Sequence, residues 1–263
     1  EEAAAPTPLG DDRLADYLHL VGSPEPERFA QLREETAERW PGGAHMVSGA
    51  QQGRLLHMLV RLARPERVLE VGCFTGYAAL WMALGLPAGG QLLSLERDER
   101  CAEVAGRYLA EAGVGERVEV RLGDALASLQ ALPADAPPFD LVFIDADKKR
   151  CGEYCTLLLE RGLLAPHALV LIDNVLWKGQ VLERLEPSAL LGTDPAAKAL
   201  GSSARRSMVL RDALHGFNVE LAADARYAQL MLPLRDGLTW AQPEPRSGGL
   251  GGEVAAAPTP LGD

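Results

Sequence analysis

Cysteine is scarce in this sequence. Only four are present in 263 residues: Cys73, Cys101, Cys151 and Cys155. Cys151 and Cys155 share one face of an expected helix, but no further Cys or His stands at the spacing that a zinc site needs. So few cysteines are typical of reduced thiols in a cytosolic compartment. We therefore expect buried or half-buried free thiols in a cytoplasmic protein.

Long apolar runs and an excess of positive charge are also absent. No apolar run approaches the ~20 residues of a membrane-spanning helix, so no membrane partner is expected, and no signal peptide is visible. The formal net charge of −11 disfavours a nucleic-acid partner, because a protein surface that binds nucleic acid is normally basic. The only dense basic run is Lys148-Lys149-Arg150. With 47% apolar residues, the chain still has enough material for a sizeable core.

The chain does contain a strand, a glycine turn and a helix in direct succession. Val68–Val71 is an apolar run interrupted only by Glu70 and is typical of a short buried strand. Gly72 and Gly76 follow, and Tyr77–Leu86 has a helical composition. In open α/β sheets a nucleotide-like ligand binds at such a turn. The spacing E-x-G-x-x-x-G differs from the dinucleotide pattern, and its acid favours a cationic or hydroxyl-rich ligand over a pyrophosphate.

The two glycines of this turn allow two interpretations. A Cβ would collide with a ligand that approaches the backbone, so Gly72 and Gly76 suit a binding turn. An ordinary strand-to-helix turn that binds nothing has the same pattern.

Strands and helices alternate along the rest of the chain. This alternation predicts an α/β fold, a mostly parallel sheet with helices on both faces and a terminal antiparallel hairpin. The expected strands are Val68–Val71, Gln91–Glu96, Val118–Leu122, Phe139–Ile144 and Ala168–Ile172, with a hairpin of Tyr227–Leu232 and Leu238–Trp240. The expected helices are Arg13–Val21, Glu25–Trp40, Gln51–Ala63, Tyr77–Leu86, Asp98–Ala112, Leu126–Leu132, Lys148–Arg161 and Ala204–Ala222.

Two of these helices carry clear local signals. Asp98 is the expected N-cap of its helix, and Gly113 is its expected stop. In the helix Gln51–Ala63, helical spacing predicts an apolar face, which consists of Leu55, Leu56, Leu59 and Leu62.

One domain is expected over residues 1–241. The helices of residues 11–63 would cap a Rossmann-like core of residues 64–241, and residues 242–263 form a Pro/Gly-rich tail without packable periodicity. Residues 3–11 (Ala-Ala-Ala-Pro-Thr-Pro-Leu-Gly-Asp) recur word for word at 255–263. This repeat is not chance, and three origins stay open: a feature added to the chain, a natural tail, or a segment that docks twice.

Acidic and amide side chains mark the ends of four predicted strands. Glu70 lies in the first strand, Glu96 ends the second, Asp145 follows another, and Asp173 and Asn174 follow the last parallel one. The carboxyl ends of parallel strands meet at one edge of a sheet, where ligands bind. Each residue alone has a plainer interpretation as a helix cap or exposed loop acid. Their joint placement favours a site.

The chemistry of these residues suggests two different ligands. Glu96 follows Gly72 by 24 positions, which places its carboxylate to accept hydrogen bonds from both hydroxyls of a ribose. Asp145, Asp173 and Asn174 are hard oxygen donors, which suit Mg²⁺, Ca²⁺ or Mn²⁺ better than zinc.

Lys148 lies one helical turn beyond Asp145 and can reach the same place. Beside a divalent cation and a cationic cofactor its pKa would fall, which would make it a general base. The alternative is a surface lysine that pairs with Asp147.

These motifs resemble those of the cation-dependent O-methyltransferases, the family of catechol and caffeoyl-CoA O-methyltransferases. The resemblance runs from about Met46 to Ala241. Four segments carry it: Val68–Tyr77 is similar to the family's glycine motif, Phe143–Lys148 to its Asp-Ala-Asp-Lys motif, Asp173–Gly179 to its Asp-Asn-x-x-x-x-Gly motif, and Leu232–Thr239 to its closing hairpin.

The resemblance implies a seven-stranded methyltransferase sheet, S-adenosylmethionine (SAM) as cofactor and a divalent cation, with Mg²⁺ expected first. The cofactor residues that it implies are Met46 near the methyl donor, Glu70, Gly72, Phe74 and Gly76 at the methionine end, Glu96 at the ribose, Gly123, Asp124 and Ala125 at the adenine, and also Asp145 and Tyr154. The implied metal ligands are Asp145, Asp173 and Asn174. Lys148 is the implied base, and Lys148 and Trp177 are assigned to the substrate.

Three departures from the family pattern leave the acceptor open. Cys151 stands where the family often has Tyr, although Tyr154 keeps a second expected Tyr. The hairpin reads Arg235-Asp236-Gly237 instead of Gly-Asp-Gly. The loop Leu182–Ser203, where substrate selectivity is set, is longer than expected.

The expected reaction transfers a methyl group to one hydroxyl of a catechol-like small molecule or its CoA ester. The resemblance also implies a homodimer. Three alternatives stay open. A hydroxyuridine of tRNA is the first alternative acceptor, and the net charge argues against it. A non-catalytic binding protein with this fold is the second, and the intact acids argue against it. A nicotinamide dehydrogenase is the third, and it lacks the expected glycine spacing.

Overall fold

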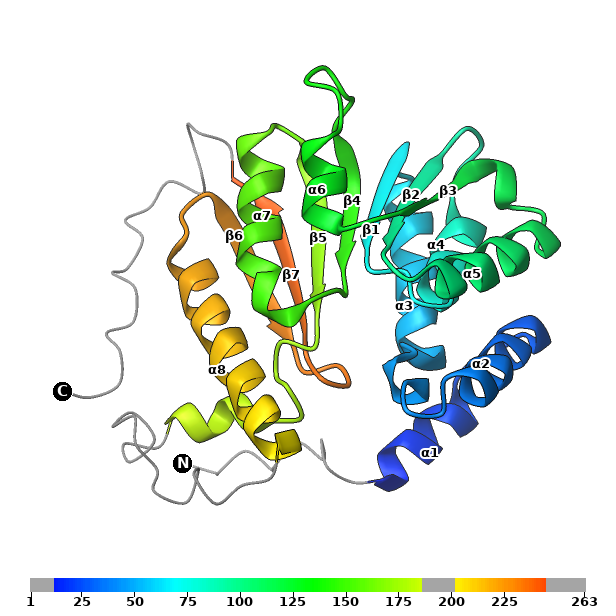
Figure 1. Ribbon diagram of the computed structural model, residues 1–263, viewed down its shortest axis with the longest axis horizontal. Coiled ribbons are helices and arrows are strands. Elements are labelled where there is room, and N and C mark those ends of the chain that lie inside the picture. Colours follow the sequence, from blue (N-terminus) through cyan, green and yellow to red (C-terminus); the bar gives the residue numbers. More distant parts are fainter. Residues whose placement is uncertain (1–11, 186–201, 245–263) are drawn as a thin grey trace.

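The computed structural model describes residues 12–185 and 202–244 (Figure 1). The repeated segments 3–11 and 255–263, and most of the long loop 182–203, lie outside the described residues. The described part contains one sheet and the helices that position the candidate site.

Seven strands form a single mixed sheet in the order β3-β2-β1-β4-β5-β7-β6. Strands β1 to β5 run parallel, and β7 is antiparallel to both β5 and β6. The predicted seven-stranded sheet with its closing antiparallel hairpin is therefore confirmed. The strands are β1 (Arg67–Val71), β2 (Gln91–Glu96), β3 (Val118–Leu122), β4 (Phe139–Ile144), β5 (Leu164–Asp173), β6 (Tyr227–Leu232) and β7 (Leu238–Pro243).

The helices follow the predicted order with small shifts at their ends. They are α1 (Asp12–Val21), α2 (Glu27–Arg39), α3 (Gly49–Ala63), α4 (Tyr77–Gly85), α5 (Glu99–Glu111), α6 (Ala125–Gln130), α7 (Cys151–Glu160) and α8 (Ser202–Ala223). The described residues also contain four short 3₁₀ helices that were not predicted: η1 (Ala44–Met46), η2 (Gly115–Arg117), η3 (Lys148–Arg150) and η4 (Gln180–Leu185). The expected helix from Lys148 onward thus begins as a 3₁₀ turn before α7.

The helix signals around α5 are confirmed. The Asp98 carboxylate accepts hydrogen bonds from the backbone N–H groups of Arg100 (2.9 Å) and Cys101 (3.4 Å), as an N-cap does. Gly113 follows the helix with φ +73°, the left-handed conformation in which glycine commonly ends a helix.

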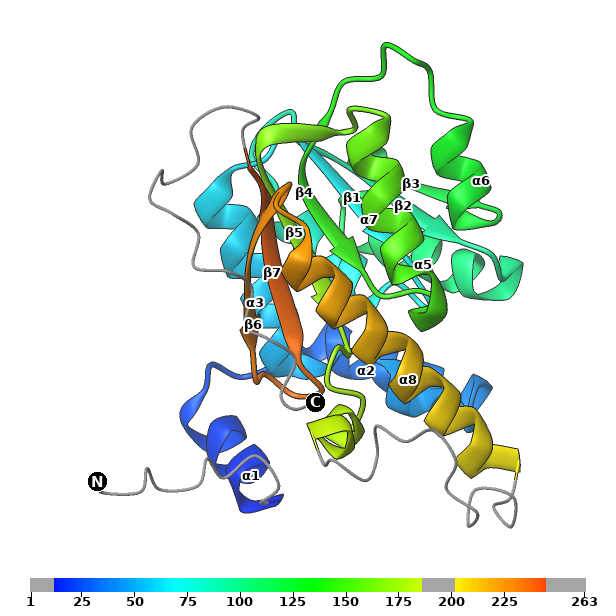
Figure 2. The same ribbon diagram turned by 90° about the vertical axis from the view of Figure 1, so that its left-hand side faces the viewer.

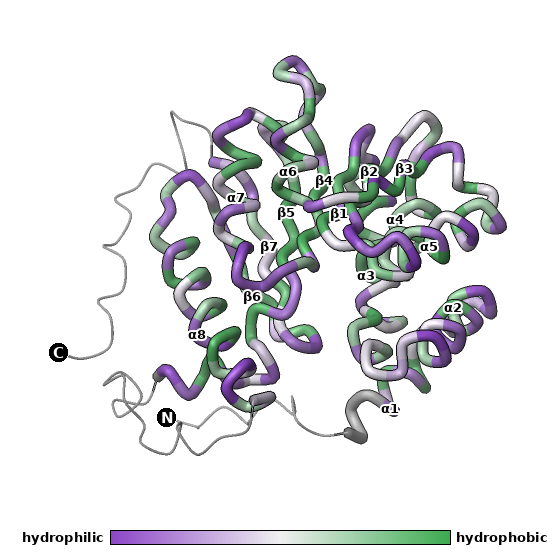
Figure 3. Tube along the Cα trace, viewed as in Figure 1, coloured by the Kyte–Doolittle hydropathy of each residue, from purple (hydrophilic) through white to green (hydrophobic). Residues whose placement is uncertain are grey.

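The sheet divides the core into two apolar clusters, one on each face. Side chains alternate along the central strands, so Leu141 packs into the cluster built with α2 to α5, and Val142 packs into the cluster built with α6 to α8. Figure 2 shows the sheet between its helices, and Figure 3 shows the apolar residues concentrated in strands such as β4 and β5. A strand buried on both faces explains the nearly continuous apolar run Phe139–Ile144.

Helix α3 packs closely on α4, with one departure from the predicted apolar face. Leu56 and Leu59 are buried, but Leu62 is 79% exposed, so the prediction for Leu62 was wrong. The buried face includes Gln52 instead, which precedes Leu56 by four residues. A Cβ on Gly53 would overlap the ring of Trp81 on α4, so the two helices meet at this glycine.

All four cysteines are free and buried, which confirms the expectation from the sequence. Among the described residues, no helix is both long and apolar enough to cross a membrane.

The contact between α3 and α4 generates a prediction about two glycines inside helices. Gly53→Ala adds a methyl group where the Trp81 ring lies, so we expect a loss of about 1–3 kcal/mol of unfolding free energy. Gly106→Ala on α5 is the matched control, because no atom lies within 4 Å of its added Cβ. Alanine there should stabilise the helix by roughly 0.5–1 kcal/mol. Urea unfolding of both variants checks this, and equal shifts in both would contradict it.

Candidate active site

The loops after β1, β2 and β4 are joined at the carboxyl edge of the sheet. The backbone N–H of Gly72 donates to the carbonyl of Leu95 (3.1 Å), and that of Asp145 donates to the carbonyl of Val71 (2.8 Å). The N–H of Gly123 likewise donates to the Glu96 carbonyl (2.7 Å). The strand order reverses around β1, which is the position where open α/β sheets bind ligands.

The glycines of the β1 turn serve packing within the protein. Gly72 (φ +97°) and Gly76 (φ +89°) adopt left-handed conformations. A Cβ on Gly72 would overlap the backbone carbonyl of Asp145, and one on Gly76 would lie 2.7 Å from the Cβ of Ala105. The missing side chains of these glycines thus make room for the backbone after β4 and for α5, and the contact of the two glycines with a ligand stays a prediction.

Glu70 is a buried carboxyl group with one free oxygen. Its side chain is fully buried, and its Oε2 accepts a hydrogen bond from the hydroxyl of Ser94, its partner on β2. Its Oε1 is buried and has no hydrogen-bond partner among the described residues. Burial raises the pKa of Glu70 to about 8. The Cys73 thiol also interacts with this carboxyl group. A buried polar atom without a well-formed hydrogen bond is costly, so this oxygen marks a place for a further polar partner.

Glu96 holds the β1 turn in place. Its Oε2 accepts the backbone N–H of Phe74 (2.6 Å), and its Oε1 accepts those of Arg97 (2.8 Å) and Asp98 (2.9 Å). Phe74 has φ +50°, which is unusual for an aromatic residue. The hydrogen bond from Glu96 helps to keep Phe74 in this conformation. The carboxylate therefore lies beside the glycine turn, as the sequence predicts.

Aromatic and thioether side chains line the N-terminal side of this turn. The ring of Phe74 packs edge-on against that of Trp40, with 5.9 Å between centroids. Met46 is 52% exposed, and its Cε and the Phe74 ring both flank Gly43. The structure thus places Met46 next to the predicted cofactor residue Phe74.

The residues predicted at the adenine lie at the start of α6. Asp124 is the N-cap of α6 and accepts the N–H of Ala127 (3.0 Å), while Gly123 precedes it with φ +146°. The other oxygen of Asp124 pairs with Arg150 (2.7 Å), whose guanidinium lies 6.0 Å from the ring of Tyr154. Tyr154 itself is buried. Arg150 therefore connects the predicted cofactor residues Asp124 and Tyr154.

The predicted metal ligands converge at the ends of β4 and β5. Ile144 pairs with Ile172 in the parallel register, so Asp145 and Asp173 follow at the same level. The Nζ of Lys148 lies 2.5 Å from Asp145 Oδ1 and donates to the backbone carbonyl of Asp173 at 3.3 Å. Asn174 follows with φ +62°, and its N–H donates to Asp173 Oδ1 (2.8 Å).

The electrostatics at the ends of β4 and β5 are dominated by two neighbouring carboxylates, those of Asp145 and Asp173. Burial, and then repulsion by Asp145, raise the pKa of Asp173 to about 6. Burial disfavours the charged form of Lys148, but the attraction of Asp145 and Asp173 outweighs it, so the pKa of Lys148 is raised. The predicted lowering of this pKa is therefore not found among the protein groups alone. Lys148 pairs with Asp145, not with Asp147, so the surface-lysine alternative is wrong.

This donor set fits a hard divalent cation. Among the described residues, no group of three or more His, Cys, Asp or Glu side chains is placed to hold a metal. The candidate ligands are therefore two carboxylates and the amide of the next residue in the chain. The two carboxylates repel each other, and a bound cation would relieve this repulsion. The residues that would hold it are Asp145, Asp173 and Asn174.

The closing hairpin forms the wall behind Asp173 and Asn174. The Asp236 carboxylate accepts the backbone N–H of Lys178, and the Asp236 carbonyl accepts that of Leu176 (2.9 Å). A Cβ on Gly237 would lie 2.5 Å from the Leu176 side chain, so glycine is required there. Arg235 (φ +50°) reaches across to the carbonyl of Val47 (3.4 Å), before α3.

Trp177 lies in the loop after β5, where its backbone N–H donates to the carbonyl of Asn174 (3.2 Å), and its contact with a substrate stays a prediction. Its indole N–H donates to the backbone carbonyl (3.1 Å) and hydroxyl (3.0 Å) of Ser207 on α8. Its half-buried ring packs with the α6–α8 cluster. No described contact joins it to Asp145 or Lys148.

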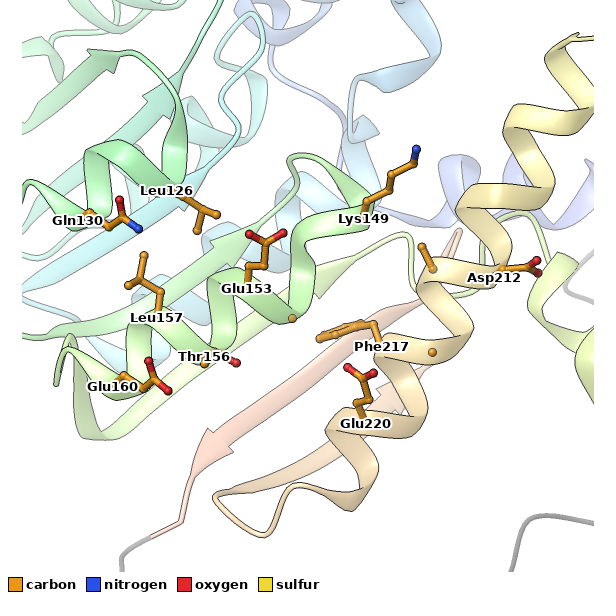
Figure 4. A pocket seen from close by; sticks show the side chains of 13 residues that line it. Leu126, Gln130, Lys149, Glu153, Thr156, Leu157, Glu160, Asp212, Phe217 and Glu220 are labelled. Carbon is orange, nitrogen blue, oxygen red and sulfur yellow. The ribbon is translucent and has the colours of Figure 1, made fainter.

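A separate groove of about 660 Å³ lies between α6, α7 and α8. Figure 4 shows Leu157 on α7 and Phe217 on α8 among its lining side chains. None of the predicted site residues lines it, so the groove is no part of the candidate active site.

The sequence reasoning missed four side chains that support the site. Gln52 donates to Asp173, Ser94 donates to Glu70, Arg150 pairs with Asp124, and Asp236 holds the loop after β5. Two of them had a visible signal. Ser94 is a polar residue inside an apolar strand, and Gln52 falls on the helix face of Leu56.

Comparison with known proteins matches residues 20–243 to the O-methyltransferase family. Caffeoyl-CoA O-methyltransferase 2 of Zea mays is 35% identical over 236 residues, which cover 88% of this chain and 83% of that protein. Two solved structures are also similar. The SAH-bound methyltransferase of Podospora anserina has a TM-score of 0.76 and 29% identity, over 89% of this chain and 95% of that one. The tomaymycin-synthesis O-methyltransferase of Streptomyces achromogenes, in complex with SAM, has a TM-score of 0.70 and 31% identity, over 89% and 96%.

The chain belongs to the O-methyltransferase family. The family resemblance, the methyltransferase fold and the enzyme class predicted from the sequence are thereby confirmed.

The buried Glu70 generates a prediction about stability and pH. Its folded-state pKa of about 8 lies above its ordinary value of 4.5, so the folded protein keeps a proton that the unfolded chain has lost. Stability therefore falls as the pH rises from about 4.5 to 8. Glu70→Gln removes this effect. It should match the wild type at pH 4.5 and exceed it above pH 8 by on the order of a few kcal/mol.

Thermal unfolding across this pH range checks the prediction. Glu96→Gln is the control with the opposite sign. Its carboxylate accepts three backbone N–H groups, so the amide should destabilise the protein at neutral pH. An effect of Glu70→Gln that does not change with pH would contradict the account.

Proposed function

We propose that the chain is a SAM- and divalent-cation-dependent O-methyltransferase that acts on a hydroxyl of a catechol-like small molecule or its CoA ester. One observation carries the proposal: Asp145, Asp173 and Lys148 meet beside the β1 turn, at the edge of a methyltransferase sheet. The names of relatives support the acceptor class, since several are caffeoyl-CoA O-methyltransferases. The SAM and SAH held by two solved relatives support the cofactor.

The β1 turn fits the amino-acid end of SAM. The free Oε1 of Glu70 is a buried acceptor that the cofactor's ammonium group would satisfy. A positive charge there would also favour the ionised carboxylate and lower the raised pKa of Glu70. Glu96 accepts the N–H of Phe74 in the same turn, and its carboxylate suits ribose hydroxyls. Gly123, Asp124 and Ala125 would border the adenine.

Asp145, Asp173 and Asn174 would hold the divalent cation, with Mg²⁺ as the expected ion. When bound, such a cation orients two adjacent hydroxyls of an acceptor and lowers the pKa of one. The protein orients its own ligands: Asn174 N–H and Gln52 each donate to one oxygen of Asp173. Phe74, Trp40 and Met46 supply apolar surface near the turn, which would help to exclude water during methyl transfer.

Lys148 is the proposed base for the acceptor hydroxyl. In the structure its ammonium is the counter-ion of Asp145, and the carboxylates raise its pKa. It therefore accepts a proton only when another positive charge neutralises Asp145. Its Nζ then lies where a hydroxyl beside Asp145 and Asp173 would give up its proton.

A homodimer is the proposed assembly. Strand β6 is an edge of the described sheet, and Leu230 on it is 58% exposed. Met231 beside it is 36% exposed. An edge strand with apolar side chains in solvent favours a protein partner.

Asp145→Ala tests the cation role. We expect activity to fall on the order of 100-fold, because an acidic ligand is lost. The measurement is methyl transfer to a panel of catechols, caffeoyl-CoA and flavonoids, with a Mg²⁺ titration and with chelator. Asp147→Ala is the control, since Asp147 is exposed and only caps the 3₁₀ turn at Lys149. Full wild-type activity in chelator would disprove the cation requirement.

Lys148→Ala tests the base. Turnover should fall by roughly 10²–10⁴, the usual contribution of a general base, while calorimetry should show unchanged SAM binding. Lys149→Ala, at the exposed neighbouring position, should behave like the wild type. Unchanged turnover of Lys148→Ala with normal binding would remove Lys148 as the base.

A further inference from the structure

A polar side chain of helix α3, that of Gln52, points into the protein core. Its amide contacts Asp173, a proposed metal ligand. Gln52 is 1% exposed, on the same face as Leu56 and Leu59. Its Nε2 donates to Asp173 Oδ2 at 2.7 Å, across 121 positions of sequence. Asp173 is itself 3% exposed. This hydrogen bond therefore joins an N-terminal helix to the carboxyl edge of the sheet where water has little access.

The chemistry of the two groups fixes which amide atom faces the acid. An ionised carboxylate only accepts hydrogen bonds, so the amide nitrogen of Gln52 must face Asp173. The second oxygen, Oδ1, accepts the backbone N–H of Asn174 at 2.8 Å. Each oxygen of Asp173 thus has one fixed donor, and together they set the rotation of the carboxylate.

The helix that carries Gln52 has a fixed position. Gly53, the next residue, meets the Trp81 ring so closely that a Cβ would overlap it. Trp81 in turn stacks on Phe29 of α2, with 4.0 Å between ring centroids. Because α3 is held by these contacts, the Gln52 amide reaches Asp173 from a rigid element, as precise ligand positioning requires.

At position 52, a neutral hydrogen-bond donor to Asp173 suits a cation site better than a positively charged donor. Lys148 already supplies one positive charge beside Asp145. A second cationic side chain at position 52 would pair with Asp173 and compete with a divalent ion. The Gln52 amide orients the carboxylate and leaves its charge for the ion.

We propose that Gln52 is a positioning residue that orients Asp173 for cation binding and makes the cation site depend on the docking of α3. This inference rests on the proposed function, because it requires that Asp173 binds a divalent cation. The residue acts through Asp173 and has no assigned contact with substrate or cofactor.

The test measures Mn²⁺ affinity directly, by electron paramagnetic resonance of free Mn²⁺ in titrations of the full chain. Gln52→Met keeps the length of the side chain and removes the donor. We expect its Mn²⁺ affinity to fall about 10- to 100-fold, as for other residues that hold metal ligands. Gln51→Met is the matched control. Gln51 is the exposed neighbour whose amide donates to the Leu18 carbonyl (2.8 Å), so its affinity should equal that of the wild type.

The outcomes separate this inference from the function on which it rests. If the wild type binds no Mn²⁺, the proposed cation site fails. If the wild type binds and Gln52→Met binds equally well, the site stands and the role of Gln52 is wrong.

Gln52→Glu covers the case in which Gln52→Met does not fold. A carboxylate at position 52 faces Asp173 without a donor, so the melting temperature without Mn²⁺ should fall below that of the wild type. Saturating Mn²⁺ should raise it less than in the wild type, because a carboxylate at position 52 cannot donate to Asp173 and so cannot orient it for the ion. A rise equal to that of the wild type, or larger, would overturn the proposal.

Discussion

The structure depends on one constraint: several carboxyl groups lie close together at the buried carboxyl edge of the sheet, and the surrounding protein must stabilise them. Glu70 and Asp173 are almost fully buried, and burial raises the pKa of both. Buried charge is costly unless it is paired and hydrogen-bonded. The surrounding protein supplies donors from many elements, namely Ser94 on β2, Gln52 on α3, Lys148 after β4 and the backbone of Asn174.

This constraint explains why elements outside the parallel sheet contact the site. The N-terminal helices reach it through Gln52 and through Thr36, whose hydroxyl lies 2.8 Å from that of Thr75 in the β1 turn. The hairpin reaches it through Asp236, which accepts the N–H of Lys178 in the loop after β5. Helix α8 holds the same loop through Ser207 and Trp177. The parallel strands place the acids, and these outer elements fix their orientation.

The sequence was enough to predict the sheet, the order of its elements and the gathering of Asp145, Lys148, Asp173 and Asn174, because parallel strands bring their carboxyl ends together. The sequence was not enough to predict features that depend on tertiary packing, such as which side chains are buried and which distant residues they contact. Leu62 fits the helical spacing yet is exposed, since α3 turns its buried face through Gln52 and Gly53 toward Trp81. The spacing places Lys148 near Asp145, but the sign of its pKa shift depends on whether the attraction of two carboxylates outweighs burial, and the spacing does not decide that balance. Helical spacing places Gln52, and not Gln51, on the buried face of α3, but nothing local identifies Asp173, 121 positions away, as its partner.

The antiparallel pairing of β7 with β5 has a consequence for the order of events in synthesis. It places the hairpin at residues 233–237 beside the loop after Asp173, and Arg235 there contacts Val47, 188 positions earlier. The described site is therefore closed by segments from near both ends of the fold. A ribosome-bound chain that stops before β7 can pair β1 to β5, yet it lacks the wall behind Asp173. The geometry described at Asp173 is thus complete only in a chain that has been made as far as β7.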